Sequence, residues 1–169
     1  MMSGWHLLKI ITGGQTGVDR AALDVALALN IPCGGWCPKG RIAENGPIPD
    51  HYPLTETDDA EYLERTRRNL TDADAVLVLY AHSLDAGSRH TINLAVDMGR
   101  PVLTVDLMLD PDPADALAFF AKLQNGLVIN VAGPRESSAP GVYELSVEYL
   151  NRLFDGIPLD DELDQLPGP

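Results

Sequence analysis

The sequence predicts a Rossmann-like α/β fold, in which helices cover both faces of a mainly parallel, doubly wound sheet of five strands or slightly more. Short apolar runs alternate with longer amphipathic segments along the chain, which is the pattern of β-α-β units. The run AVLVLY at residues 75–80 is apolar throughout, as expected for a parallel strand that is buried on both faces. Helical crossovers between such strands are right-handed almost without exception, so successive units predict a doubly wound sheet.

The individual elements follow from the apolar pattern and from the residues that start helices. Thr16 is expected to cap the first helix, with Asp19 in the capping-box position. Thr57 and Ser88 are expected to cap the second and third helices. We expect strands at residues 7–12, 31–36, 75–80, 102–105 and 127–131, and helices at residues 18–29, 58–70, 89–98, 113–123 and 142–154.

The length of 169 residues fits one domain. This domain is expected to occupy residues 1–155 and to be followed by an acidic tail at residues 156–169, which either frays or docks on a neighbouring subunit. Residues 37–57 form a long polar stretch between the second strand and the second helix. Loops of about 20 residues are uncommon in compact domains and are usually functional or disordered.

The net charge of −13, from 25 acidic and 12 basic residues, argues against a nucleic-acid or membrane partner, because a field of this sign repels nucleic acids and anionic lipids. No run approaches the roughly 18–20 apolar residues of a membrane span, and residues 1–12 resemble a first strand and not a signal peptide. We therefore expect a cytoplasmic protein. Cys33 and Cys37 are expected to be reduced thiols, since in a strand they would lie too far apart to share a disulfide or a metal.

A glycine-rich loop, Gly13-Gly14-Gln15-Thr16-Gly17, joins the first strand to the first helix. Glycines let the backbone approach a ligand closely, and the free amides at a helix start favour an anion. The alternative is a tight turn with a capping threonine. The phosphate-binding loop of nucleoside triphosphatases would continue with Gly-Lys-Ser/Thr, and a dinucleotide fingerprint would have another spacing and an acidic residue after the second strand. A nicotinamide-dependent redox enzyme is therefore disfavoured.

Two further loops are expected at the same edge of the sheet. Residues 86–91 open the helix after the third strand and resemble a second anion site, with simple capping as the alternative. Residues 133–138 follow the last strand and form either a third ligand loop or an exposed turn. Ligands of doubly wound sheets bind at the carboxyl ends of the strands, so the three loops are expected to share one site.

Basic residues concentrate on and just after these loops. Arg20, Arg89 and His90 lie in first helical turns, where the helix dipole disfavours positive charge by roughly 0.3–1 kcal/mol each. An anionic ligand would supply the missing partner, whereas the alternative for Arg20 is a salt bridge to Asp24. The cations that are expected to converge on one rim and bind a small anion are Arg20, Lys39, Arg41, Arg89 and Arg135.

Catalytic groups are sparse, and we assign no catalytic residue. His82, Ser83 and Asp85 lie within four residues, but a nucleophilic triad needs spatial and not sequential proximity, and a polar turn explains them more simply. Trp36 and Tyr52 either offer a stacking surface for a planar ring or anchor the long loop. The carboxylates that could serve as general acids or bases are Glu44, Glu56 and Glu136, which the sequence neither pairs nor buries.

The candidate ligand-binding residues come from the three loops, from the first turns of the helices that follow them and from residues 36–41. They are Gly13, Gly14, Gln15, Thr16, Gly17, Arg20, Trp36, Lys39, Gly40, Arg41, Gly87, Ser88, Arg89, His90, Thr91, Gly133, Pro134, Arg135 and Glu136.

Three motifs in order resemble the putative molybdenum carrier family: GGQTGVDRAALD at residues 13–24 with GWCPKGR at residues 35–41, GSRHT at residues 87–91, and NVAGPRES at residues 130–137. The resemblance runs from about Lys9 to Leu153. That family is similar to molybdenum cofactor carrier proteins and, more remotely, to lysine-decarboxylase-like phosphoribohydrolases. The resemblance implies a Rossmann-like fold, a homodimer or homotetramer, and a site for a phosphorylated pterin or nucleotide. The phosphate contacts that it suggests are Gly13, Gly14, Thr16, Gly17, Gly87, Ser88 and Thr91.

The sequence thus favours a binding or carrier protein for molybdenum cofactor or a related phosphate-bearing small molecule. The alternatives are a nucleotide-processing enzyme that uses Glu136 or Glu44, and a nucleotide sensor whose acidic tail docks on a partner protein. The phosphoribohydrolases carry a proline-glycine-glycine-x-glycine-threonine-x-x-glutamate loop. When Gly87 and Ser88 are matched to its last glycine and threonine, Thr91 stands where the catalytic glutamate belongs, which disfavours hydrolysis by that mechanism.

Overall fold

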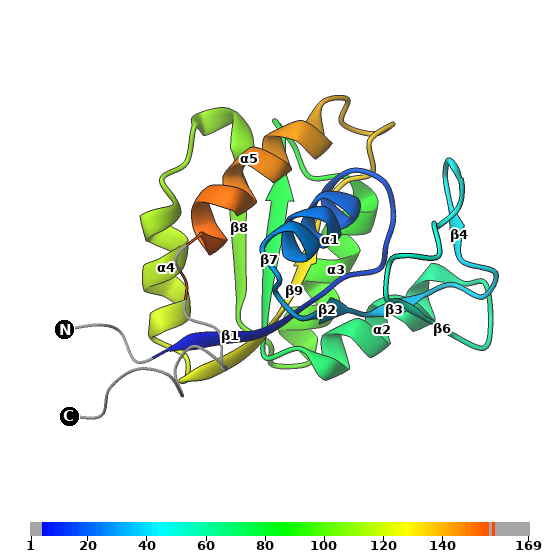
Figure 1. Ribbon diagram of the computed structural model, residues 1–169, viewed down its shortest axis with the longest axis horizontal. Coiled ribbons are helices and arrows are strands. Elements are labelled where there is room, and N and C mark those ends of the chain that lie inside the picture. The colour runs from blue at the N-terminus through cyan, green and yellow to red at the C-terminus, as the bar shows by residue number, and fades with distance from the viewer. Residues whose placement is uncertain (1–4, 156, 158–169) are drawn as a thin grey trace.

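The computed structural model describes residues 5–155 and residue 157, and it contains a five-stranded parallel sheet. The chain starts at an inner strand, crosses to one edge, returns to build the opposite edge, and ends with a strand inserted between the two halves (Figure 1). This arrangement confirms the predicted doubly wound, Rossmann-like α/β fold. The strands lie in the order β2 (Cys33–Gly34), β1 (His6–Ile11), β9 (Gly126–Ala132), β7 (Ala75–Tyr80) and β8 (Val102–Asp106).

Helices cover both faces of the sheet. Three of them pack with the largest group of buried apolar side chains on one face: α1 (Val18–Ala28), α4 (Pro113–Ala121) and α5 (Val142–Phe154). The opposite face carries α2 (Tyr62–Asp72) and α3 (Ala86–Asp97), and a short 3-10 turn, η1 (Leu107–Leu109), follows β8.

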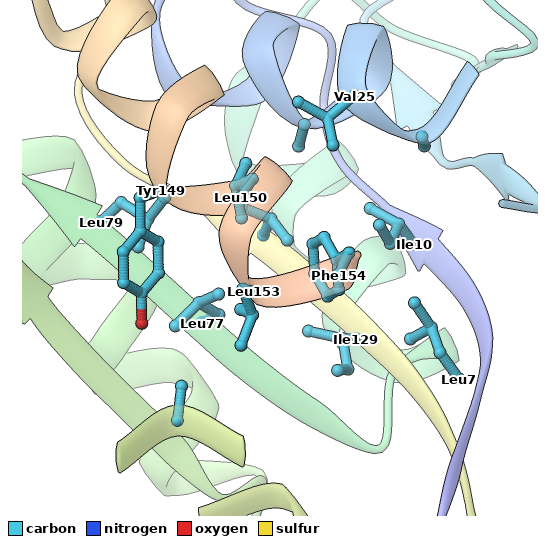
Figure 2. Close-up of a cluster of buried hydrophobic side chains, with 14 of the residues drawn as sticks. Leu7, Ile10, Val25, Leu77, Leu79, Ile129, Tyr149, Leu150, Leu153 and Phe154 are labelled. Atoms are coloured by element: carbon cyan, nitrogen blue, oxygen red, sulfur yellow. The ribbon is translucent and has the colours of Figure 1, made fainter. Parts of the chain in front are cut away.

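The central strand β7 shows why the sheet has two apolar faces. Successive side chains of a strand point to opposite sides. Leu77 and Leu79 join the cluster under α5, together with Leu150 and Leu153 (Figure 2). Val76 and Val78 face the other way and pack beneath α2 and α3. The continuous apolar run at residues 75–80 is therefore buried on both sides, as predicted.

The expected second strand at residues 31–36 is divided by Gly35. Only Cys33–Gly34 pairs with β1, and Trp36–Cys37 (β3) pairs with Thr55–Glu56 (β6) in a separate two-stranded sheet. Gly35 has a φ of 133°, and a Cβ at this position would lie 2.1 Å from the Thr12 carbonyl oxygen. A side chain does not fit in that space, and the positive φ turns the chain out of the main sheet.

The long stretch after Cys37 is built around Arg41. A small hairpin, β4 (Ile42–Ala43) with β5 (Gly46–Pro47), projects from it. The Arg41 guanidinium donates hydrogen bonds to the carbonyl oxygens of Ile48, Leu54, Pro49 and Tyr52, at 2.8–3.3 Å. These four bonds hold the stretch together in the absence of a large sheet.

Tyr52 anchors this stretch to the body of the domain. Its hydroxyl donates to one oxygen of Asp24 at 2.5 Å, and the Tyr143 hydroxyl donates to the other oxygen at 2.5 Å. The Arg20 guanidinium lies 5.3 Å from the centre of the Tyr52 ring. Of the two alternatives for Tyr52, the anchoring role is therefore the one that the structure shows.

The predicted helix caps are wrong in three places. Helix α1 starts after Gly17, without a side-chain cap, and the Thr16 hydroxyl instead donates to Glu44. Helix α3 starts earlier than expected, and Asp85, not Ser88, caps it. Helix α2 begins only at Tyr62 after the uncapped Glu61, and the Thr57 hydroxyl donates to the Asp59 carbonyl oxygen.

Within the described residues, no helix is both long and apolar enough to cross a membrane. The proposed acidic tail at residues 156–169 lies outside the described part of the chain, apart from Ile157.

Truncation of Leu150 is expected to destabilise the domain. This side chain is fully buried between α5 and the sheet, and Leu→Ala substitutions at such positions cost about 2–5 kcal/mol through lost burial and a residual cavity. We expect Leu150→Ala to lower the free energy of unfolding by that amount in urea denaturation. The exposed Leu63 supplies the control, because Leu63→Ala should leave the transition midpoint nearly unchanged.

The tyrosines predict a loss of stability at alkaline pH. Burial and the hydrogen bond to Asp24 raise the pKa of Tyr143 to about 12, and they raise the pKa of Tyr52 as well. Unfolded tyrosines ionise near pH 10, so the unfolded state is favoured increasingly above that pH until the folded tyrosines ionise. The contribution of these tyrosines to the free energy of unfolding should therefore be fully present below about pH 9 and be lost between about pH 10 and 12. Tyr143→Phe should reduce this loss, and an unchanged pH profile in that variant would contradict the assignment.

Candidate functional site

A cavity of about 370 Å³ lies where the loops after β1, β7 and β9 meet α2. In doubly wound sheets, the carboxyl ends of the strands near a reversal of strand order are the usual ligand site, and the insertion of β9 between β1 and β7 creates such a point here. The cavity is lined by Gly13, Gln15, Asp19, Tyr62, Leu63, Arg65, Thr66, Asn69, Asp85, Ala86, Gly87, Ser88, His90, Thr91, Asn130, Val131, Ala132, Gly133 and Arg135.

The end of β9 lines the cavity between the other two loops. Asn130 contributes a polar side chain whose residue is only 4% exposed. Gly133 comes next, where the backbone passes close to strand β7. A Cβ at this position would lie 2.2 Å from the Leu79 carbonyl oxygen. The loop that carries Arg135 can therefore leave β9 close to β7 only with glycine at this position.

Arg65 of α2 is the central cation of the cavity. Its guanidinium covers Gly13 so closely that a Cβ on that glycine would lie 1.3 Å from Nη1. Nη1 also lies 3.3 Å from Asp19 Oδ2, and the Tyr62 ring centre lies 5.3 Å from Cζ. Arg65 Nε is buried and has no hydrogen-bond partner among the described residues. Buried donors are nearly always paired, so this nitrogen is an unsatisfied donor of a side chain that lines the cavity.

Asp19 is the buried counterion of Arg65. Its side chain is 8% exposed, and it also accepts a hydrogen bond from the Gln15 amide at 3.2 Å. Burial raises the pKa of the Asp19 carboxyl above its usual value, and the nearby Arg65 guanidinium offsets part of that increase. Carboxyls with perturbed pKa values in a cavity are characteristic of functional sites, although structural ion pairs produce them too.

The glycine-rich loop is a more closed structure than its sequence suggests. The Gly14 amide donates to Thr12 Oγ1, and the Gln15 amide donates to Asp19. The Thr16 amide donates to the side-chain oxygen of Gln15. Three successive amides are therefore occupied by side chains, and they do not form the open phosphate cradle that we expected.

The start of α3 is occupied in a similar way. Asp85 Oδ1 accepts a hydrogen bond from the Ser88 amide at 2.9 Å, so a carboxylate stands where the sequence predicted a phosphate. The Ser88 hydroxyl lies beside the cavity, is buried and has no partner among the described residues. Thr91 Oγ1 donates back to the Gly87 carbonyl oxygen at 3.1 Å.

The structure divides the predicted site residues into three groups. Those that line the cavity are Gly13, Gln15, Gly87, Ser88, His90, Thr91, Gly133 and Arg135. Those that line an adjoining, more open groove are Thr16, Gly17, Arg20 and Glu136. Those that line neither are Gly14, Trp36, Lys39, Gly40, Arg41, Arg89 and Pro134.

The expected convergence of the arginines on one site is wrong. Arg20 donates to the Gly14 carbonyl oxygen and lines the adjoining groove, and Arg41 holds the long stretch together. Arg89 is exposed and lines neither the cavity nor the groove. Among the predicted cations, only Arg135 lines the cavity. The physical reason is that Arg20 and Arg41 find backbone carbonyls within reach, which the sequence pattern does not reveal.

Trp36 is likewise absent from the cavity wall. Its indole nitrogen donates to Asp72 at 2.8 Å, and the Arg68 guanidinium lies 4.6 Å from its ring centre. Its backbone is paired with the side chain of Asn69. Trp36 therefore joins β3 to α2 and does not offer a stacking surface.

Glu44 connects the β4–β5 hairpin to two cavity loops. Its carboxylate accepts hydrogen bonds from the Thr16 hydroxyl and from the amide and hydroxyl of Ser137. Desolvation raises the pKa of Glu44, but the hydrogen bonds from Ser137 and Thr16 outweigh it, so the net pKa is lowered. Glu136 accepts from the Gly141 and Tyr143 amides at the start of α5. Neither glutamate lines the cavity.

Sequence reasoning missed the contribution of α2. Tyr62, Arg65, Thr66 and Asn69 all line the cavity, and they recur at the i, i+3, i+4, i+7 spacing of one helix face. A mixed polar and aromatic stripe at helical spacing was the available signal.

The cysteines take no part in the cavity. Burial raises the pKa of the Cys33 and Cys37 thiols above the usual value, and neither residue lines the cavity. Among the described residues, no group of three or more His, Cys, Asp or Glu side chains could hold a metal ion.

Comparisons with known proteins agree with the geometry. A solved structure from Syntrophus aciditrophicus SB, described as a putative molybdenum carrier protein, is 38% identical and superposes with a TM-score of 0.79. The match covers 88% of this chain and 95% of that one. No curated protein matches the chain.

A family model named cpYpsA, for the circularly permutated YpsA SLOG family, matches residues 10–154. This range includes all five strands of the main sheet except the first residues of β1, and it includes every residue that lines the cavity. On this match, the chain belongs to the circularly permutated YpsA SLOG family.

Proposed function

We propose that this protein binds and carries a phosphorylated pterin or nucleotide, molybdenum cofactor included. The observation that carries the proposal is the state of Arg65: a half-buried guanidinium at the cavity wall whose Nε has no partner among the described residues. Guanidinium groups suit phosphate because they present several donors in a planar fork. A phosphate beside Arg65 would satisfy the free nitrogen while Asp19 keeps the other side of the fork.

The charges of the cavity support one orientation of the ligand. Arg65 belongs to the part of the cavity formed by Gly13, Gln15 and Asp19. Arg135 is close enough to Glu44, which is bonded to Thr16, to lower the pKa of that glutamate. Both arginines therefore lie toward the loop after β1, whereas Asp85 lies at the loop after β7. We therefore propose that the phosphate binds at the arginine side.

Molybdenum cofactor fits this site as cargo. A volume of about 370 Å³ lies within the roughly 300–1,000 Å³ of small-molecule sites. The pterin dithiolene would bring the sulfur ligands of the metal, which agrees with a cavity that contains no cysteine. The solved relative that is described as a putative molybdenum carrier protein supports this choice.

Removal of the Asp19–Arg65 ion pair is expected to weaken phosphate binding. Arg65→Met alone would leave Asp19 buried without its cation, at a cost of several kcal/mol, so the double variant Asp19→Asn/Arg65→Met is the cleaner test. Loss of a charge-assisted hydrogen bond costs about 1.5–3 kcal/mol, which corresponds to a loss of affinity of roughly tenfold or more. Isothermal titration calorimetry with molybdopterin, GMP and AMP measures it.

Arg67 provides the matched control on the same helix. It is exposed and does not line the cavity, so Arg67→Met should bind each ligand as the unmodified protein does. Equal affinities in the double variant and the unmodified protein, with thermal unfolding confirming that both are folded, would contradict the proposed role of the cavity.

Nucleotide hydrolysis is the second candidate, and Asp19 is the observation that favours it. A buried carboxyl with a raised pKa can hold a proton for a leaving base. Glu44 and Glu136, which the sequence suggested for this role, are engaged elsewhere. On the carrier proposal, incubation with GMP and AMP should release no free base by chromatography. Release that disappears in Asp19→Asn would instead establish the enzyme.

A further inference from the structure

The loop after β7 contributes a carboxylate, Asp85, to the lining of the cavity. One oxygen of Asp85 is bonded to the Ser88 amide. The other oxygen, Oδ2, accepts no hydrogen bond from the residues that the structure describes, and Asp85 lines the cavity wall. A capping carboxylate is common at helix starts, so the bond to the Ser88 amide does not by itself indicate that Asp85 binds a ligand.

The Ser88 hydroxyl is an independent indication that a ligand binds beside Asp85. Ser88 is 3% exposed, its Oγ has no partner among the described residues, and the residue lines the cavity next to Asp85. A buried hydroxyl without a partner costs free energy that a bound ligand would recover. Asn130 adds a second buried polar side chain on the same wall. This side of the cavity is built for polar contacts.

The chemistry of these groups limits what can occupy this side. A carboxylate accepts hydrogen bonds and donates none, and it repels a phosphate. The group that meets Asp85 must therefore present N–H or O–H donors. The Ser88 hydroxyl and the Asn130 amide can each donate or accept, and they suit a ring carbonyl beside those donors.

We propose that Asp85 is a specificity-determining residue that selects a 2-amino-4-oxopyrimidine edge, the ring N–H and amino group that guanine and pterins share. Two adjacent donors on this edge match the two oxygens of a carboxylate. Adenine presents a ring nitrogen acceptor at the equivalent position and would face the carboxylate with a lone pair. This inference rests on the proposed function, and it adds which part of the ligand lies at which end of the cavity.

Calorimetry with GMP, IMP and AMP tests the assignment, because the three share the phosphate and ribose and differ in the ring edge. IMP keeps the ring N–H and lacks the amino group, and AMP lacks both donors in this arrangement. The protein should bind GMP at least tenfold more tightly than AMP, with IMP between them. Asp85→Asn keeps the oxygen that caps Ser88 and removes the charge, so GMP should lose its preference while the affinity for AMP is retained or increased.

Asp112 is the matched control. It caps α4 through an equivalent bond, from the Ala114 amide to Oδ1 at 2.9 Å, and it does not line the cavity. Asp112→Asn should keep the order GMP, IMP, AMP. A preference for AMP in the unmodified protein, or an undiminished preference for GMP in Asp85→Asn, would overturn the inference even if all three nucleotides bind.

The remaining outcomes separate the two proposals and the two ligand sources. If none of the nucleotides binds the unmodified protein, and neopterin phosphate does not bind either, the proposed function fails and this inference falls with it. If neopterin phosphate binds more tightly than GMP and loses affinity in Asp85→Asn, the edge belongs to a pterin. If GMP binds more tightly than neopterin phosphate and loses affinity in Asp85→Asn, the ligand is a guanine nucleotide.

Discussion

The insertion of β9 between β1 and β7 is the constraint on which the site depends. It brings three loops that are distant in sequence to one edge of the sheet, where they line the cavity and pass close to neighbouring backbone at single glycines. A Cβ on Gly17 would lie 2.4 Å from the Pro134 carbonyl oxygen, and one on Gly133 would lie 2.2 Å from that of Leu79. These contacts explain why glycine stands where the loops pass each other. The glycines thus determine how closely the cavity walls approach, and they serve the packing of backbone against backbone at least as much as any contact with a ligand.

The second organising feature is that the protein satisfies its own amides around the cavity. Helix starts and glycine loops often bind anions through free amides. Here Asp19 accepts from the loop before α1, and Asp85 accepts from the first turn of α3. Both positions are already held by carboxylates, so the proposed phosphate would meet the guanidinium groups of Arg65 and Arg135 and not these amides. The same carboxylates make the cavity sensitive to hydrogen-bond donors on the ligand.

Much of the fold could be predicted from the sequence because apolar periodicity reports burial directly. Strand β7 and helix α5 begin and end at the predicted residues. The division of the second strand could not be placed, because it depends on the approach of Gly35 to the Thr12 backbone. Helix α2 begins four residues later than predicted, since Thr57 bonds to Asp59 and does not cap it.

The site was only partly predictable, and the errors share a cause. The loops that line the cavity were recognised by glycines at strand ends, which report local backbone geometry. The function of a cation depends on what lies within its reach, and an arginine has a long side chain. Arg41 finds four carbonyl oxygens in its own stretch, whereas Arg65 reaches across to Gly13 and Asp19. The position of an arginine in the sequence could not distinguish a structural role such as that of Arg41 from a place in the cavity wall such as that of Arg65.

The proposed carrier function requires release of the ligand as well as binding, and the ion pair of Arg65 with Asp19 bears on that requirement. An unpaired buried arginine would bind phosphate tightly, because the empty site would leave a desolvated charge. Asp19 supplies a counterion in the empty state, so part of the attraction to phosphate is already satisfied before the ligand arrives. Burial raises the pKa of Asp19, which shows that the carboxylate itself is held at a cost. The ion pair therefore lowers the difference in free energy between the empty and the occupied cavity, and this is the condition for reversible binding.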